Sequence, residues 1–462
     1  MTIIKSIRNK SRKSNRIFQD FRSFLSFLEQ EAELIRINKQ VSTRFELAAI
    51  VSKLDGKKAV VFENVDNNSH FKVASNVIGT RRRFSLALGS KEQNVIHPNL
   101  VQPHVKLIIP KKVSDKPPFD DNSSKNLDEL PIINHFEKDA GPYITSSIVF
   151  AKDLETGTQN SSTHRLLKID DKNMAIRMVE GRHLHKCYSC AVEQGEDLKV
   201  SICIGVHPAA SIAAAYQAAY GIDEMLIANS LLDSKLTLTK THYSQLYVPT
   251  HSEIVLEGRI LKDRSADEWM VEMLRTYDIK RKQPIFELDT IRFRNDAIFH
   301  DILPGFAEHR LLMGLPVEAK MLEGIKNVVP STRTVYLTDG GSNWLNAVIQ
   351  IRKRLEGEPK NALIAAFASH PSLKVAVVVD EDIDPYDPIA VEYAISTRCQ
   401  ADKDVMTVGN VKGSSLDPSS DQVNLVTAKM GIDATATLLK PKDRFEVAKI
   451  PGQEDIKLSN YI

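Results

Sequence analysis

The sequence lacks several features that would place it in a well-marked class of protein. Its 462 residues include only four cysteines, too few for a disulfide framework, so a reducing compartment such as the cytoplasm is expected. No uninterrupted apolar run approaches the roughly 18–20 residues of a membrane-spanning helix, and we expect no membrane span. The net charge of +2 excludes the protein-wide basic field that would indicate nucleic acid as a partner.

Familiar local catalytic motifs are missing as well. The chain contains no glycine-rich phosphate loop, no His-Glu-x-x-His zinc motif and no nucleophile-elbow serine. Its composition is that of an ordinary globular protein with a substantial core, 42% hydrophobic and 26% charged. At the usual domain size, this length predicts about two to four domains.

Residues 1–17 are predicted to form a basic flexible arm. Six Lys or Arg residues and no acid occur between Met1 and Arg16. An organellar transit peptide is an alternative, but the arm has no clear amphipathic stripe. A disordered arm or an upstream start codon is therefore favoured.

Residues 18–110 are predicted to form a small N-terminal α/β domain. Apolar residues recur at helical spacing from Phe21 to Leu28, which indicates an amphipathic helix. The short apolar runs Ala59–Phe62 and Phe71–Ala74 are typical of strands. The polar, proline-containing segment 111–125 indicates a linker.

The rest of the chain divides into a strand-rich part and a part in which helices and strands alternate. Residues 127–304 contain an alanine-rich helix, Pro208–Tyr220, and several strands that suggest a barrel-like sheet. These strands are Ile144–Phe150, Met174–Met178, Leu198–Ile204 and Ile254–Ile260. In 305–440 the buried strand Val375–Val379 lies between helical patterns, which predicts a C-terminal α/β domain, followed by a polar tail at 441–462.

The most conspicuous local pattern is a run of two histidines and two cysteines, His183, His185, Cys187 and Cys190. Such residues could bind zinc or cycle a disulfide. A structural zinc site normally needs a second pair of ligands, and the remaining cysteines stand alone. The cysteines are therefore interpreted as small core residues, with the zinc or redox site as the alternative.

A second, dispersed set comprises Asn160 with Arg165, then His183 and Glu224. Each has an ordinary explanation by itself, but the surrounding residues resemble one family, the UbiD decarboxylases, from about Asp20 to Pro441. The segments that carry the resemblance are Tyr143–Thr145, Lys152–Gly157, Asn160–Arg165, Gly181–His183, Ile204–Pro208, Tyr220–Glu224, Val248–Gly258 and His370–Lys374 leading into Val377–Pro385.

The resemblance implies a fold and a set of cofactors. It implies a mixed α+β and α/β chain, with a central split β-barrel that binds flavin and an α/β domain on either side. It also implies prenylated FMN, with Mn²⁺ (or Mg²⁺) held against the cofactor phosphate by Asn160, His183 and Glu224; K⁺ is a further candidate. An amide, an imidazole and a carboxylate suit Mn²⁺ or Mg²⁺ better than Zn²⁺. The further cofactor-binding residues implied by the family are Thr163, His164, Arg165, Arg182 and Lys374.

The family's acid–arginine–acid network maps onto Asp267, Arg165 and Glu272, with Glu272 as the general acid and Asp267 as the arginine partner. The family carries Gly-Pro-Phe-Gly between its two acids, whereas this chain has Glu268–Val271 there. The register is therefore open, because Glu268 could replace Asp267. We also expect three large side chains of this segment to crowd the substrate side, those of Trp269, Met270 and Met273.

The resemblance implies reversible, non-oxidative decarboxylation of an unsaturated or aromatic acid. Four segments are most similar to the archaeal-type branch that decarboxylates trans-anhydromevalonate 5-phosphate, the favoured substrate. They are Thr276–Asp278 with Gln283-Pro284, His309–Gly314, Gly340-Gly341 and Gly413–Pro418. The alternatives are an aromatic acid decarboxylase, such as one for polyprenyl-hydroxybenzoate, and a flavin-binding paralogue without turnover. A flavin prenyltransferase as cofactor supplier and a homodimer or higher homo-oligomer are also implied.

The cysteine pair yields a testable prediction. Replacing Cys187 and Cys190 together by serine should leave flavin content and most turnover intact, because the family site needs no thiolate. Flavin absorbance, turnover and metal analysis of the purified variant check this. Stoichiometric zinc in the wild type that disappears in the variant would support the zinc alternative instead.

Overall fold

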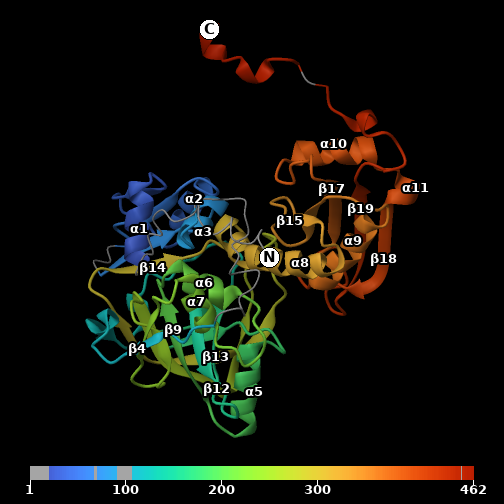
Figure 1. Ribbon diagram of the computed structural model, residues 1–462. Coiled ribbons are helices and arrows are strands. Elements are labelled where there is room, and N and C mark those ends of the chain that lie inside the picture. Colours follow the sequence, from blue (N-terminus) through green and yellow to red (C-terminus); the bar gives the residue numbers. More distant parts are fainter. Residues whose placement is uncertain (1–19, 67–69, 91–106, 449, 462) are drawn as a thin grey trace. The chain divides into compact units, whose positions relative to one another are not determined.

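The computed structural model describes residues 20–66, 70–90, 107–448 and 450–461 (Figure 1). The chain divides into two compact units, Met1–Lys320 and Met321–Ile462, and helix α8 (Ala307–Val328) carries the chain from the first into the second. The predicted basic arm lies outside the described residues. Within the described part, no helix is both long enough and apolar enough to span a bilayer.

The N-terminal part of the first unit is a four-stranded sheet with helices around it. Helix α1 (Phe21–Gln30) confirms the predicted amphipathic helix, and the backbone N–H of Ser23 donates to the capping carboxylate of Asp20 at 2.8 Å. The sheet order is β1-β2-β3-β14, so a strand from much later in the chain completes it. The elements are β1 (Leu34–Ile37), α2 (Glu46–Lys53), β2 (Ala59–Phe62), β3 (Phe71–Ser75), α3 (Arg81–Ala87) and β14 (Ala297–Asp301).

The centre of the first unit is a closed barrel of six strands, which confirms the predicted barrel. Neighbouring strands follow the order β12-β9-β6-β7-β8-β13, and β13 pairs with β12 to close the ring, while β5 extends the sheet beyond β13. The strands are β5 (Asn122–Ser124), β6 (Tyr143–Lys152), β7 (Gln159–Lys168), β8 (Asn173–Ile176), β9 (Leu198–Ile204), β12 (Ile254–Glu268) and β13 (Arg281–Phe293).

The segment expected to be a linker, 111–125, contains two short strands. One is β5, and the other is β4 (Lys111–Val113), which pairs with β10 (Thr237–Lys240) in a small sheet that β11 (Tyr247–Pro249) completes. Strands of three mostly polar residues are too short to show apolar alternation, so no periodic signal marks them. Three helices pack around the barrel, α5 (His183–Glu193), α6 (Pro208–Ala215) and α7 (Glu224–Leu231); α6 ends five residues earlier than predicted.

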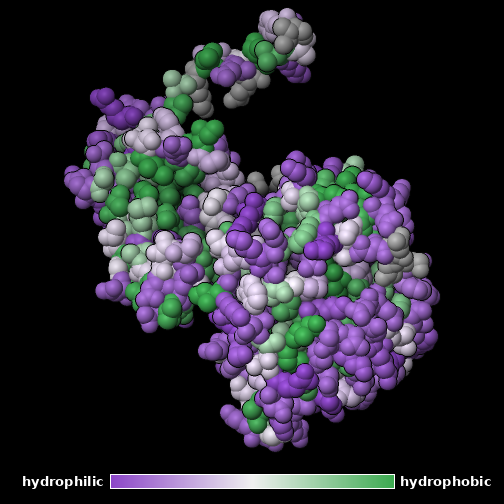
Figure 2. Space-filling view, turned by 180° about the vertical axis from the view of Figure 1, so that it is seen from behind, coloured by the Kyte–Doolittle hydropathy of each residue, from purple (hydrophilic) through white to green (hydrophobic). Residues whose placement is uncertain are grey.

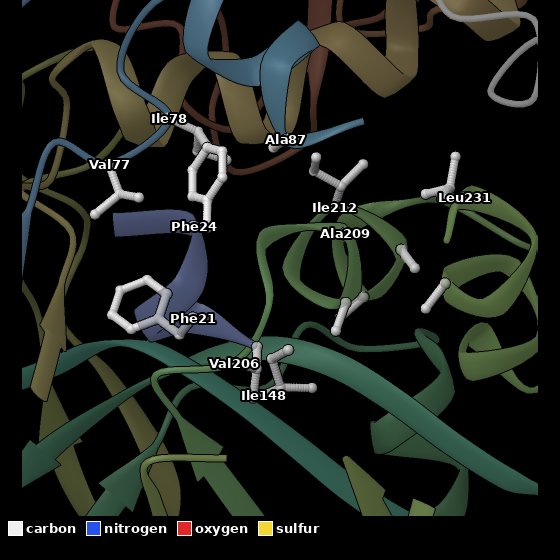
Figure 3. Close-up of a cluster of buried hydrophobic side chains, with 14 of the residues drawn as sticks. Phe21, Phe24, Val77, Ile78, Ala87, Ile148, Val206, Ala209, Ile212 and Leu231 are labelled. Atoms are coloured by element: carbon white, nitrogen blue, oxygen red, sulfur yellow. The ribbon is translucent and has the colours of Figure 1, made fainter. Parts of the chain in front are cut away.

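Helix α1 is part of the hydrophobic core that joins the N-terminal sheet to the barrel. Figure 3 shows Phe21 and Phe24 of α1 among side chains of α6, the 77–78 segment and strand β6. Both phenylalanines are fully buried. Burying an aromatic side chain contributes about 1.5–3 kcal/mol. These contacts therefore help to hold the N-terminal sheet against the barrel.

The second unit is an α/β layer with a five-stranded sheet in the order β15-β16-β17-β19-β18. The predicted buried strand and the helices on either side of it are confirmed as β17, α9 and α10. Figure 2 shows hydrophobic residues gathered on one face of this unit. Its elements are β15 (Thr332–Leu337), β16 (Asn346–Ile351), α9 (Glu358–Ser369), β17 (Val375–Asp380), α10 (Pro388–Arg398), α11 (Ala401–Asp404), β18 (Val405–Lys412) and β19 (Val426–Ala434).

Barrel closure depends on a glycine at the seam between β12 and β13. A Cβ atom on Gly258 would lie 2.1 Å from the carbonyl oxygen of Glu287 and 2.8 Å from the ring of Phe286. Gly258→Ala should therefore lower the free energy of unfolding by about 1–3 kcal/mol, as overpacked cores do. Chemical denaturation measures this. Gly409→Ala is the control, because a Cβ there meets no atom within 4 Å; equal losses for both variants would contradict the seam argument.

Candidate active site

Strand β7 carries polar residues of two separate groups, one near each of its ends. Asn160 lies near its start and Arg165 five residues later. At about 3.3 Å per residue, these two positions are about 16 Å apart along the strand. The first group contains the predicted metal ligands, and the second contains the predicted acids.

The first group centres on the carboxylate of Glu224, at the start of α7. This side chain is buried and accepts hydrogen bonds from Nδ2 of Asn160 at 3.0 Å and from the backbone N–H of Ser161 at 2.8 Å. Nδ1 of His183, the first residue of α5, lies 3.4 Å from the same carboxylate. The fold thus brings together three residues that are widely separated in the sequence.

These three side chains fit a divalent cation. Within the described part of the chain, no Lys or Arg forms an ion pair with Glu224, so a buried carboxylate stands there without a full positive charge. A cation would supply that charge. No three His, Cys, Asp or Glu side chains of the described residues gather closely enough to hold a metal, but here the third donor would be the amide oxygen of Asn160, which accepts from the hydroxyl of Ser162 at 3.2 Å. Their role as ligands stays a prediction.

A small hollow, about 230 Å³ when the open solvent at its mouth is included, adjoins this group. Tyr220 lines it, and its hydroxyl donates a hydrogen bond to the carboxylate of Asp153. The ring of Tyr220 also meets the ring of His183 edge to face, with centroids 5.2 Å apart. The hollow is lined by Asp153, Thr156, Thr158, Gln159, Asn160, His183, Cys187, Tyr220, Gly221 and Ile222.

His164 connects the two groups along β7. Burial lowers the pKa of His164 to about 4, so the ring is neutral near pH 7. Its Nδ1 lies 2.8 Å from the carbonyl oxygen of Arg177 and must carry the proton, which leaves Nε2 to accept from the hydroxyl of Ser162 at 2.9 Å. Both ring nitrogens of His164 are thus hydrogen-bonded.

The second group surrounds the guanidinium of Arg165 with three carboxylates. Glu268 accepts from Nε and Nη2 at 2.8 and 3.0 Å, Asp278 accepts from Nη2 at 3.0 Å, and Glu272 accepts from Nη1. Burial alone would lower the pKa of Arg165, but the charges of Glu272 and Glu268 outweigh it and raise this pKa above its ordinary value. The cation is therefore permanent.

The structure corrects the predicted arginine partner. Asp267 does not contact Arg165; its carboxylate is 40% exposed and pairs with Lys280 at 2.9 Å and Lys282 at 3.6 Å. Successive residues of a strand point to opposite faces, so a shift of one residue exchanges an inward for an outward side chain. At the end of β12, Glu268 is the residue whose side chain points toward Arg165. Glu268 was the alternative to Asp267 in the sequence analysis.

The three side chains that were expected to crowd the substrate side each have partners within the protein. Met270 packs into a buried cluster with residues that include Tyr143 and Leu261. Trp269 donates its indole N–H to the carbonyl oxygen of Lys138 at 2.8 Å, and its ring lies under the ammonium group of Lys280. Met273 is buried.

Two further residues complete the acid group without having been assigned a role from the sequence. Tyr143 is fully buried and donates its hydroxyl to Glu268 at 2.9 Å. Asp278 lies opposite Met270 in a small hairpin, where its N–H donates to the Met270 carbonyl oxygen at 2.9 Å. The Thr276–Asp278 segment had carried family resemblance, but no spacing rule indicates that this hairpin returns the aspartate to Arg165.

The remaining predicted cofactor residues lie at three different places. Thr163 is on β7 between the two groups, and Arg182 is the exposed residue that precedes α5. Lys374 belongs to the second unit, where its ammonium group pairs with Asp417 at 2.6 Å and contacts Ser419. The cofactor-binding role of each of these residues stays a prediction.

Comparisons with known proteins agree on one family. Three sequence families match in order along the chain, the N-terminal, Rift-related and C-terminal domains of 3-octaprenyl-4-hydroxybenzoate carboxy-lyase (UbiD), over residues 25–97, 111–307 and 310–434. The anhydromevalonate phosphate decarboxylase of Methanocaldococcus jannaschii is 43% identical over 419 residues, which cover 89% of this chain and 96% of that relative.

Solved structures give the same answer. The UbiD-class enzyme HmfF from Pelotomaculum thermopropionicum, in complex with FMN, has a TM-score of 0.92 and 37% identity over 96% of this chain and 100% of its own. An evolved dimeric form of HmfF in complex with prFMN has a TM-score of 0.88 and 34% identity, over 96% of this chain and 100% of its own. With sequence and fold in agreement over nearly its full length, the chain belongs to the UbiD family of carboxy-lyases.

Proposed function

We propose that this protein decarboxylates trans-anhydromevalonate 5-phosphate, using prenylated FMN and a divalent metal ion, Mn²⁺ or Mg²⁺. The observation that carries the proposal is the Arg165 group, in which one of three carboxylates, that of Glu272, stays accessible. The substrate is inferred from the 43% identity to an anhydromevalonate phosphate decarboxylase across 96% of that relative.

The two groups on β7 suit the two ends of one flavin mononucleotide. Asn160, His183 and Glu224 would hold a metal ion that neutralises the cofactor phosphate. Hydroxyl and amide side chains are among the groups that line the hollow beside them.

When bound, prenylated FMN supplies the electron sink that loss of carbon dioxide requires, which no protein side chain can provide. The chain's own residues then manage the proton. Glu272 is 18% exposed, against 1% for Glu268 and 3% for Asp278, so it is the carboxylate that a substrate carbon could reach. We assign it the transfer of a proton to the carbon that loses its carboxylate.

Arg165 and Glu268 position this acid. The fork of Arg165 is held by both carboxylate oxygens of Glu268, a geometry that fixes the orientation of the guanidinium plane. Nη1 is then directed at Glu272. Because the guanidinium stays charged, it can stabilise the carboxylate form of Glu272 after proton transfer.

Glu272→Gln tests the acid assignment. Glutamine keeps the shape of the side chain but cannot transfer the proton, so turnover should fall by about 10²–10⁴-fold while flavin content stays normal. Carbon dioxide release and solvent-deuterium incorporation measure this after co-expression with a flavin prenyltransferase. Asp267→Asn, on the outward face, is the matched control and should stay near wild type. Wild-type carbon dioxide release by Glu272→Gln would rule out this acid, and no release by the wild type would support the non-catalytic alternative.

Glu224→Ala tests the metal assignment. Loss of this buried carboxylate removes the negative charge of the proposed set, so both Mn²⁺ and flavin should be lost from the purified protein. Metal analysis and flavin absorbance report the two separately, and circular dichroism checks the fold. Normal amounts of metal and flavin in this variant would show that the metal binds elsewhere.

A further inference from the structure

Asp278 differs from the other two carboxylates that contact Arg165 because two more arginines approach it. Its Oδ1 accepts from Nη1 of Arg281 at 2.5 Å and from the backbone N–H of Ile279 at 2.8 Å. Its Oδ2 accepts from Arg165 and lies 3.9 Å from Nε of Arg177. Three guanidinium groups thus share one side chain that is only 3% exposed.

Among the side chains that form ion pairs with one another in this group, the charges balance. Three carboxylates, those of Glu268, Glu272 and Asp278, face three guanidinium groups, those of Arg165, Arg177 and Arg281. Two neutral groups complete the surroundings: Tyr143, which donates to Glu268, and His309 of α8, whose Nδ1 accepts from the N–H of Gly305 at 3.1 Å. A fourth carboxylate, that of Asp139, accepts from the N–H of Val271 at 3.0 Å and interacts electrostatically with Arg165; burial raises its pKa.

The three carboxylates are held to different degrees. Glu268 receives three side-chain hydrogen bonds, and Asp278 receives two from arginines and one from the backbone. Glu272 receives one from Arg165 and a longer one, 3.2 Å, from the N–H of Met273. Glu272 is therefore the least firmly held of the three carboxylates.

We propose that Asp278 is a positioning residue whose negative charge offsets Arg177 and Arg281 beside Glu272, the acid to which the proton transfer is assigned. The inference rests on the proposed function of Glu272. Without Asp278, two carboxylates would face three guanidinium groups, and this excess of positive charge would favour the ionised form of Glu272. Asp278 also holds Nη2 of Arg165, which fixes the direction of Nη1 toward Glu272.

The test measures the titration of Glu272 directly. Protein without cofactor, labelled with ¹³C at the glutamate side-chain carboxyl, is titrated by NMR, and the Glu272 signal is identified by its absence from Glu272→Gln. In Asp278→Asn the midpoint should move to lower pH by roughly half a unit to one unit. In Arg281→Gln, which removes one positive charge instead, it should move to higher pH.

Charge rescue separates an electrostatic role from a merely structural one. The double variant Asp278→Asn/Arg281→Gln restores the balance at two against two, and its midpoint should return toward that of the wild type. The alkaline limb of the kcat profile of the holoenzyme with trans-anhydromevalonate 5-phosphate should follow the same order. Asp267→Asn, whose carboxylate faces solvent beside two lysines, should leave the midpoint unchanged.

An unchanged midpoint in Asp278→Asn, or shifts of the same sign in Asp278→Asn and Arg281→Gln, would overturn the proposal. If Asp278→Asn fails to fold, the upward shift in Arg281→Gln still decides it. Failure of the proposed function has a different signature: Glu272→Gln would then keep its turnover, which would overturn both assignments. Failure of this inference alone leaves Glu272→Gln inactive and the Asp278→Asn midpoint unmoved.

Discussion

Burying a guanidinium group costs several kcal/mol of lost hydration unless carboxylates meet it at hydrogen-bonding distance. Arg165 is only 12% exposed, and its partners come from three places: the end of β12, the turn after it and the far arm of the small hairpin. Each of these segments must therefore adopt its observed path for Arg165 to be paired. The segment Glu268–Val271 follows a path that lets Glu268 pair with Arg165, even though it lacks the family's glycines and proline.

Closure of the barrel is what brings those segments to β7. Strands β12 and β13 pair along their length and return the chain to β8, which lies beside β7. The hairpin between Met270 and Asp278 sits at the connection of β12 to β13, so the pairing that closes the barrel also places the acid group. Gly258 allows the two strands to approach at this seam. Stability and site geometry thus depend on the same strand pair.

Much of this arrangement could be predicted from sequence, where a periodic pattern or an ordered set of family motifs was present. The pattern from Phe21 to Leu28 predicted α1, and the family motifs indicated both the barrel and the residues on β7. The partner of Arg165 could not be predicted in this way. Asp267 and Glu268 are adjacent acids, and they differ only in which side of strand β12 each side chain points to. The role of Asp278 was not predicted for a related reason. Its partner Arg165 is 113 positions away in sequence, and the hairpin that brings Asp278 to it has no regular spacing.

The division of labour among the acids follows from how firmly each is held. A carboxylate that accepts several charge-assisted hydrogen bonds in a buried site strongly favours its ionised form, and Asp278 meets that description. Burial alone would raise the pKa of Asp278, but the hydrogen bond from Arg281 and the charge of Arg165 outweigh it and lower this pKa. A carboxylate held ionised in this way is a poor proton donor, but its negative charge contributes to the electrostatic field at the neighbouring groups. A proton-transfer residue needs the opposite, weaker holding and access to the reacting carbon, and among these three carboxylates Glu272 is the one that combines them.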